Sequence, residues 1–259
     1  MSIQVIINIL CFLFGSLIGS FLNVVIYRVP RELSVVTPRS SCPNCNHEIK
    51  WYENIPIISY LFLKGKCSNC KQKVSVRYPL VELLMGVVAM LLAPSDFAIT
   101  SLINFSFYFS VAAIFLAHLM IDIEFKLLPD KINLYFLLIT IPYSIANLPL
   151  FYWLAGGLIG FLGPCIITVL FYKLRGVVGL GGGDIKLFGI LGLILGPFGI
   201  LSNIFMSCML GSIVGLGLIV TKKMSRDSAF AFGPFIIIAA SVQIFMPEFF
   251  AMINPFSLK

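Results

Sequence analysis

Long apolar runs separated by short polar loops dominate this chain. The first run, residues 3–27, carries no charge, and a bilayer core of about 30 Å needs only about 20 helical residues. Further apolar runs occupy residues 78–95, 97–121, 132–172, 187–221 and 228–247. The runs 132–172 and 187–221 are too long for one crossing, and both contain a helix-breaking sequence, Asn147-Leu148-Pro149 or Gly196-Pro197-Phe198-Gly199. The pattern therefore predicts an all-α polytopic membrane protein with about eight transmembrane helices.

The amino-acid composition agrees with this pattern. Of 259 residues, 59% are hydrophobic and 11% are charged, against roughly 25% charged in ordinary soluble domains. The chain has too few polar side chains to cover a globule in water, so the bilayer must be its main solvent. Composition thus excludes a soluble globular protein, a disordered chain and a nucleic-acid scaffold.

The positions of the basic residues predict the orientation of the spans. If eight helices cross the membrane, alternate loops hold 17 of the 18 Lys and Arg, and only Lys259 falls on the other side. These basic loops are residues 28–77, 122–131, 173–186 and 222–227. The positive-inside rule places them in the cytoplasm and both chain termini outside. No basic residue precedes the first run, so we expect it to remain uncleaved.

The segment 28–77 is the one long polar stretch, and it contains four cysteines in two Cys-x-x-Cys pairs. The pairs are Cys42 with Cys45 and Cys67 with Cys70. Such pairs are typical of a tetrathiolate zinc ribbon, and a loop of this size has too little apolar core to fold unaided. Disulfides are the alternative, but a cytoplasmic position is reducing. The pattern favours a structural Zn²⁺ held by four thiolates, with His47 outside the ligand set.

The same segment is basic, with nine Lys and Arg against Glu32, Glu48 and Glu53. A basic excess can mark nucleic-acid binding, but beside a membrane it more often sets orientation or contacts anionic lipid. We therefore expect membrane lipid, and no nucleic acid, as a partner of this segment.

Two aspartates stand where apolar runs meet the predicted cytoplasmic face. Asp122 ends the third span, and Asp184 follows three glycines at the start of the sixth. Ionised groups near hydrocarbon are costly and are usually retained for function. Two carboxylates at one depth can share a proton, so that one acts as general base on water and the other as general acid, as in aspartic proteases. A proton- or ion-coupling pair in a transporter and simple helix caps are the alternatives at this point.

The residues Gly181, Gly182 and Gly183 bear on the choice between these alternatives. They permit positive φ and would let a substrate backbone approach Asp184 without an intervening side chain. Glycine-rich loops before helices also bind phosphate, but no Walker pattern surrounds Lys186. Glu82 lies in the first turn of the second span. Either a favourable contact with the helix dipole or a role in a site would explain an acid there.

Ordered sequence blocks over nearly the whole chain resemble one family, the bacterial type IV prepilin peptidases, which are membrane aspartic proteases of the Gly-x-Gly-Asp class. The blocks are Gly19-Ser20-Phe21-Leu22-Asn23-Val24-Val25-Ile26-Tyr27-Arg28-Val29-Pro30, Pro38-Arg39-Ser40-Ser41-Cys42-Pro43-Asn44-Cys45, Trp51-Tyr52-Glu53-Asn54-Ile55-Pro56, Arg77-Tyr78-Pro79-Leu80-Val81-Glu82, Asp122 with Leu128-Pro129-Asp130, Gly181-Gly182-Gly183-Asp184-Ile185-Lys186, and Phe232-Gly233-Pro234-Phe235. A set of blocks in this order is far more specific than any single motif.

The resemblance implies a catalytic pair of Asp122 and Asp184 in the bacterial cytoplasmic (inner) membrane, acting at its cytoplasmic face. The implied substrates are the N-terminal segments of prepilins and pseudopilins, cut after the Gly that joins a basic leader to an apolar helix. Members with the Cys-rich loop typically also N-methylate the new N-terminus from S-adenosylmethionine. The implied methyl-donor or substrate residues are Asn23, Arg28 and Glu82.

The predicted organisation is a first transmembrane helix in residues 1–27, a four-cysteine metal-binding domain in 28–77 and a seven-helix membrane peptidase core in 78–259. A proton-coupled transporter with a zinc-ribbon regulatory domain is one alternative function. It predicts acids deeper in the bilayer and inverted repeats, and neither is clear in the sequence. A membrane anchor whose ribbon recruits partners is the other, but it leaves the glycines before Asp184 without a purpose. No oligomeric state is predicted.

Overall fold

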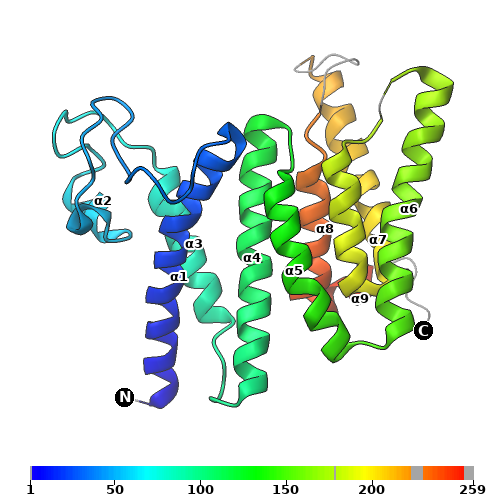
Figure 1. The fold of residues 1–259 in the computed structure, drawn as a ribbon, viewed down its shortest axis with the longest axis horizontal. Helices are drawn as coiled ribbons and strands as arrows, with labels where there is room; N and C mark the ends of the chain where they lie inside the picture. Colours follow the sequence, from blue (N-terminus) through cyan, green and yellow to red (C-terminus); the bar gives the residue numbers. More distant parts are fainter. Residues whose placement is uncertain (1, 178, 223–229, 254–259) are drawn as a thin grey trace. The chain divides into compact units, whose positions relative to one another are not determined.

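The structure is a computed structural model that describes residues 2–177, 179–222 and 230–253, and helices dominate it (Figure 1). The α-helices are α1 (Ile3–Arg28), α2 (Ile58–Phe62), α3 (Arg77–Leu91), α4 (Ile99–Phe125), α5 (Asp130–Asn147), α6 (Leu150–Arg175), α7 (Gly182–Val220), α8 (Gly233–Phe245) and α9 (Pro247–Ile253). Two 3-10 helices, η1 (Val29–Arg31) and η2 (Trp51–Asn54), lie between α1 and α3. No strand forms in the described residues, so the all-α prediction is confirmed for them.

Four helices are long and apolar enough to cross a membrane: α1 with its η1 extension, α4, α6 and α7. A multi-pass arrangement is therefore confirmed in outline, but the predicted number of eight crossings is not. Helix α3 has 15 residues and α8 has 13, fewer than the about 20 that a full crossing needs, and α5 is less apolar than the four. The predicted loop 222–227 lies outside the described residues apart from Lys222, as does Lys259.

The two predicted helix breaks are both present, in different forms. Helix α5 ends at Asn147 and α6 begins at Leu150, so this break is a true turn. The break at 196–199 is instead a kink inside α7, where Gly196 has φ 69° and ψ −176°. The aromatic ring of Tyr152 packs against Gly196, and a Cβ there would lie 2.1 Å from that ring. Glycine is thus required both by the backbone and by the space.

Residues 1–113 and 114–259 form two compact units, and the boundary falls within α4. In the first unit α1 and α3 pack closely through glycines. A Cβ at Gly15 would lie 2.4 Å from the carbonyl of Met85, and one at Gly19 would lie 2.7 Å from Cα of Glu82. Small residues let apolar helices approach closely where no hydrophobic effect drives them together.

The second unit repeats this device between α6 and α7. Gly156 and Gly192 face each other, and a Cβ on either one would lie 2.1 Å from the carbonyl of the other. Gly160 approaches the carbonyl of Phe188 in the same way, at 2.3 Å for the same hypothetical atom. This tight pairing positions the first half of α7, the helix whose first turn carries Asp184.

Candidate functional sites: a tetracysteine module and a carboxylate pair

Two short loops in the segment 28–77 have the same backbone structure. In the first, the N–H of Cys42 donates to the carbonyl of His47 at 2.9 Å, and the N–H of Asn46 donates to the carbonyl of Cys42 at 2.9 Å. The second loop repeats both bonds: Cys67 N–H to Gln72 O at 2.9 Å, and Lys71 N–H to Cys67 O at 3.1 Å. The residue after each second cysteine is left-handed, with φ 55° at Asn46 and 60° at Lys71. Each loop is a knuckle that directs two thiols to one side.

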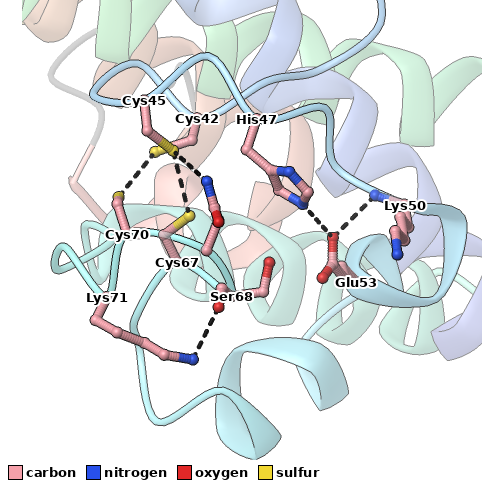
Figure 2. Close-up of polar contacts among 10 residues, drawn as sticks. Cys42, Cys45, His47, Lys50, Glu53, Cys67, Ser68, Cys70 and Lys71 are labelled. Carbon is pink, nitrogen blue, oxygen red and sulfur yellow. Dashed lines mark hydrogen bonds and ion pairs between the residues drawn. The ribbon is translucent and has the colours of Figure 1, made fainter.

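The four sulfur atoms converge between the two knuckles (Figure 2). Cys42 Sγ lies 3.8 Å from Cys70 Sγ, Cys45 Sγ lies 3.9 Å from Cys67 Sγ, and all four lie within 4.8 Å of one another. A tetrahedral zinc ion with Zn–S bonds of about 2.3 Å requires sulfur separations of about 3.8 Å. The four cysteines are free thiols and not disulfides. The residues of this chain therefore fit a metal ion of the size of Zn²⁺.

The pKa values of two of the thiols, Cys70 and Cys42, are shifted in opposite directions. The backbone N–H of Gln72 holds the pKa of Cys70 down, to about 6. The pKa of Cys42 is raised to about 11 even though the N–H of Asn44 lowers it, because burial and the neighbouring thiols oppose a further negative charge. Thiols this close cannot all ionise by themselves, and a bound cation removes that conflict.

Two asparagines of the knuckles donate to the sulfurs, Asn44 Nδ2 to Cys70 Sγ at 3.8 Å and Asn69 Nδ2 to Cys45 Sγ at 3.7 Å, whereas His47 does not. His47 Nε2 points away from the sulfurs and lies 3.7 Å from Glu53 Oε2 (Figure 2). Glu53 also accepts the N–H of Lys50 at 3.0 Å. His47 is therefore a partner of Glu53 and not a member of the four-residue cluster.

The second site lies in the unit 114–259 and is centred on Asp122, near the end of α4. The Asp122 side chain is buried, at 4% exposure, and its Oδ2 accepts the backbone N–H of Gly233 at 2.9 Å. Gly233 is the first residue of α8, and a Cβ on it would lie 2.8 Å from that same carboxylate oxygen. Only glycine lets the α8 backbone come this close. The sequence pattern included Gly233 in a family block but did not identify it as a site residue.

Asp184 lies in the first turn of α7, and its carboxylate interacts electrostatically with that of Asp122. The Gly181 N–H also hydrogen-bonds to the Asp184 carboxylate. Asp184 Oδ1 is buried and has no hydrogen-bond partner among the described residues. The structure thus brings together the two aspartates that the sequence singled out, and one buried acceptor oxygen of Asp184 has no partner among the described residues.

Two of the three glycines before Asp184 are needed for space. Glycine permits positive φ, but none of the three uses that freedom here. A Cβ on Gly181 would lie 2.9 Å from Asp184 Oδ2, and one on Gly183 would lie 2.8 Å from the carbonyl of Leu128. A Cβ on Gly182 would meet nothing within 4 Å. Close packing around the carboxylates therefore imposes a Gly-x-Gly-Asp pattern on this loop.

A buried polar chain connects the helices that carry the two aspartates, and sequence analysis missed it. His118, one turn before Asp122, is fully buried, and its Nε2 lies 3.1 Å from Asn133 Oδ1 on α5. Asn133 Nδ2 donates to the carbonyl of Gly183 at 3.4 Å. The available signal was a histidine four positions before Asp122, but a lone histidine in an apolar run is not specific.

Two charged residues, Asp130 and Lys186, lie close in sequence to Leu128 and to the glycine loop, and they bind each other. Asp130 and Lys186 form an exposed ion pair of 2.6 Å, with side-chain exposures of 71% and 48%. Lys186 is thus the partner of a carboxylate on α5, in agreement with the absence of a Walker pattern around it.

The three residues implied for the methyl donor lie in the first unit but do not share one site. Asn23 Nδ2 donates to the carbonyl of Tyr78 at 3.1 Å, and Glu82 Oε2 accepts the N–H of Ile57 at 2.7 Å. Arg28 donates to two loop carbonyls, and it lines a cavity of about 290 Å³ that neither Asn23 nor Glu82 borders. Of the three residues, Arg28 is therefore the one that lines this cavity.

These features define a class of protein: an all-helical, multi-pass membrane protein with a tetracysteine module in one unit and a buried carboxylate pair in the other. Residues 13–95 match the family model described as "Bacterial Peptidase A24 N-terminal domain". Residues 107–216 match the model described as "Type IV leader peptidase family". No solved structure gives a significant match.

Curated relatives cover most of the chain. A protein of Aeromonas salmonicida (strain A449) named "Prepilin leader peptidase/N-methyltransferase" is 34% identical over 91% of this chain and 89% of its own length. Proteins of the same name from Bacillus subtilis (strain 168) and Neisseria gonorrhoeae are each 34% identical, over 91% and 85% of this chain and over 92% and 84% of their own lengths. The chain belongs to the type IV leader peptidase family, and the resemblance found in the sequence is confirmed.

Proposed function

We propose that this protein removes the basic leader of type IV prepilins and pseudopilins after a glycine, and that it then N-methylates the new N-terminus. The names of relatives that align over most of the chain support both activities. The single observation that carries the peptidase is the buried pair of Asp122 and Asp184, with Asp184 Oδ1 unpartnered among the described residues.

In the proposed reaction the two carboxylates share one proton. Like charges at short range resist ionising together, so the resting pair holds one ionised and one protonated aspartate. The ionised aspartate takes a proton from water as the water oxygen bonds to the scissile carbonyl carbon, and the protonated one gives its proton to the carbonyl oxygen. The first aspartate, now protonated, gives its proton to the amide nitrogen, and the second takes back the proton of the gem-diol hydroxyl as the C–N bond breaks. The leader leaves as a carboxylic acid, the pilin leaves as a free amine, and the pair again holds one proton.

The backbone around the pair supports this assignment. The N–H of Gly233 holds Asp122 in one orientation, and the absence of side chains at Gly181 and Gly183 lets the loop pack closely against Asp184 and Leu128. Preorganised donors and a site that excludes bulk water strengthen every charge interaction during the reaction. A helix cap alone would require none of these contacts from α8.

For the metal, we propose Zn²⁺ held by Cys42, Cys45, Cys67 and Cys70. The sulfur separations of 3.8 and 3.9 Å match a tetrahedral thiolate shell. Four thiolates close the coordination shell, so the ion would be structural and would supply folding energy to residues 28–77.

For the methyl donor, we propose that Arg28 and Arg39 at the cavity of about 290 Å³ bind the carboxylate of S-adenosylmethionine. S-adenosylmethionine would supply an electrophilic methyl group for the free N-terminal amine of the cut pilin. The hydrogen-bond partners of Asn23 and Glu82 favour a supporting role for both residues.

For orientation, we propose that the protein lies in the bacterial inner membrane with both termini outside. The metal module and the carboxylate pair would then stand at the cytoplasmic face. The distribution of Lys and Arg supports this topology, and it agrees with a substrate whose leader is basic and still cytoplasmic.

The test is leader removal by the purified, detergent-solubilised protein and by Asp122→Asn and Asp184→Asn variants. Product masses are recorded with and without S-adenosylmethionine. We expect wild type to remove the leader, each variant to lose at least about 10²-fold in rate, and the cut product to gain one methyl mass only with the donor.

The matched control is Asp130→Asn, because Asp130 is an exposed acid of the same unit with its own partner, Lys186. It should keep most of the peptidase rate. Robust leader removal by the Asp184→Asn variant would overturn the proposed pair. An equal loss of rate in all three variants would also contradict the pair, because removal of any acid of this unit would then have the same effect.

A further inference from the structure

The loops of the tetracysteine module, residues 28–77 (the Cys module), lie partly beside α1 and not only beyond its C-terminal end. The cavity that Arg28 borders is also lined by Leu17 and Ser20 of α1 and by Val36 and Asn54 of the module. Leu17 precedes Arg28 by eleven residues, which corresponds to about 16 Å along a helix. Part of this polar segment therefore lies level with an apolar helix that is long enough to cross a membrane.

One hydrogen bond fixes the module at that depth. The N–H of Ile57 donates to Glu82 Oε2 at 2.7 Å, and Ser20 also hydrogen-bonds to the Glu82 carboxylate. Ser20 lies eight residues, or about 12 Å, inward from Arg28 along α1. Helix α2 begins at the next residue, Ile58, so this bond also sets where α2 starts.

The backbone at this anchor is strained, which indicates that the contact holds it in place. Ile57 has φ 64°, a conformation that is rare for a β-branched side chain. Glu82 is 8% exposed and packs beside Gly19, so its carboxylate needs the partners that Ile57 and Ser20 provide. The result is a short helix held at the depth of Ser20.

The two short helices on either side of Ile57, η2 and α2, expose large apolar side chains. Trp51 in η2 is 81% exposed, and Leu61 and Phe62 in α2 are 68% and 84% exposed. Lysines flank both elements, at Lys50 and Lys64. Exposed aromatic residues with adjacent lysines are typical of side chains at a membrane–water interface, where the ring enters the lipid and the ammonium reaches the headgroups.

We propose that Trp51, Leu61 and Phe62, together called the α2 platform, insert into the interfacial layer of the leaflet at the Arg28 end of α1. The occupant of this surface is lipid. The basic excess of residues 28–77, nine Lys and Arg against three Glu, complements anionic headgroups. The platform would hold the Cys module at a fixed height against the bilayer, independently of peptide cleavage.

The protein's two tryptophans, Trp51 and Trp153, allow a direct test. A Trp153→Phe variant of the full chain leaves Trp51 as the only indole. It is placed in nanodiscs of phosphatidylethanolamine and phosphatidylglycerol whose acyl chains are either ordinary or brominated near the headgroup. We expect a blue-shifted emission, a marked loss of emission in the brominated discs, and weak quenching by acrylamide.

Two results would overturn the proposal. Strong acrylamide quenching without bromine quenching would place Trp51 in water. Protection from both quenchers would mean that protein, such as another part of this chain or a second copy, covers the platform instead of lipid.

The anchor is tested in the same Trp153→Phe background with Glu82→Gln and Glu82→Ala. A glutamine carbonyl can still accept the Ile57 N–H, so bromine quenching should persist, whereas the alanine variant should lose most of it. Metal content reports whether the Cys module stays folded in each variant. Undiminished quenching in a metal-loaded Glu82→Ala variant would contradict the depth assignment from Glu82.

Discussion

The tetracysteine module and the carboxylate pair each gather like-charged groups, but they are assembled over very different lengths of chain. The sulfurs of Cys42 and Cys70 are 28 residues apart in sequence, and each knuckle is closed by bonds within a few residues. Asp122 is held by a backbone N–H that is 111 residues away, at Gly233. The first site depends on local turns, and the second depends on the packing of four helices.

The two sites also differ in how charge is balanced. Four thiols within 4.8 Å need an external cation before all of them can ionise. Two carboxylates need only to share a proton, and the nearby backbone supplies hydrogen bonds. The module should therefore respond to metal, whereas the pair should respond to changes of about 1 Å in helix packing.

The largest effect is expected from loss of a thiolate in the module. Cys42→Ser should remove the metal, because one ligand of a closed shell is lost, and structural zinc supplies about 10 kcal/mol or more to such small modules. Metal analysis and protease cleavage within residues 28–77 measure this. Cys208→Ser, an exposed cysteine on α7, is the control and should change neither. A metal-free Cys42→Ser protein with an intact, protease-resistant module would contradict the assignment.

The next largest effect is a difference in cleavage rate between alanine substitutions at two neighbouring glycines, Gly183 and Gly182. Gly183→Ala should reduce leader removal by about 10²-fold, because the new Cβ would force α7 away from Leu128 and misplace Asp184. Gly182→Ala should keep nearly the full rate, since its Cβ meets open space. Initial rates of prepilin cleavage compare the two. Equal losses would mean that backbone freedom, and not space, is the reason for the glycines.

A smaller effect is expected from the buried chain between His118, Asn133 and Gly183. Asn133→Ala removes a hydrogen bond to each neighbour and should cost about 1 to 3 kcal/mol of stability. We expect kcat to fall with little change in KM, because the start of α7 is less well positioned.

Thr140→Val is the control for this chain. Thr140 is also fully buried on α5, and its hydroxyl has no partner among the described residues, so its loss should be neutral or stabilising. Thermal unfolding and steady-state kinetics report both variants. An unchanged kcat in Asn133→Ala would mean that the hydrogen bonds from His118 through Asn133 to Gly183 contribute to stability and not to catalysis.

The smallest effect concerns pH and Glu53 beside the knuckles. The N–H of Lys50 holds the pKa of Glu53 below its ordinary value of 4.5. A depressed pKa stabilises the folded module above the unfolded value, and that contribution is lost as the pH falls through the folded value. The free energy of unfolding of the module, measured by proteolysis, should thus be higher in wild type than in Glu53→Gln by about 0.5 kcal/mol at pH 7. This difference should disappear below about pH 4.5. A stability difference that grows as the pH falls would contradict a lowered pKa for Glu53.

Particular residues show how far sequence analysis reached. The Cys-x-x-Cys pairs, the break at 147–149 and the two aspartates were predicted because each has a local pattern of residue types. The sequence indicated that Gly181 to Gly183 permit positive φ, but none of them uses it, and the close approach of Leu128 to Gly183 could not be predicted because Leu128 comes from another segment. The count of eight crossings was not confirmed, because hydropathy does not reveal that α3 and α8 form short helices.

The sequence by itself determined that the chain is a helical membrane protein with four clustered cysteines and two aspartates at span ends. These properties follow from composition, periodicity and spacing, which act over a few residues. Only the tertiary structure decided that Gly233 holds Asp122, that Asn133 connects His118 to the start of α7, and that Glu82 anchors Ile57. Contacts of this kind depend on where close-packed helices place distant residues, and no local pattern encodes that placement.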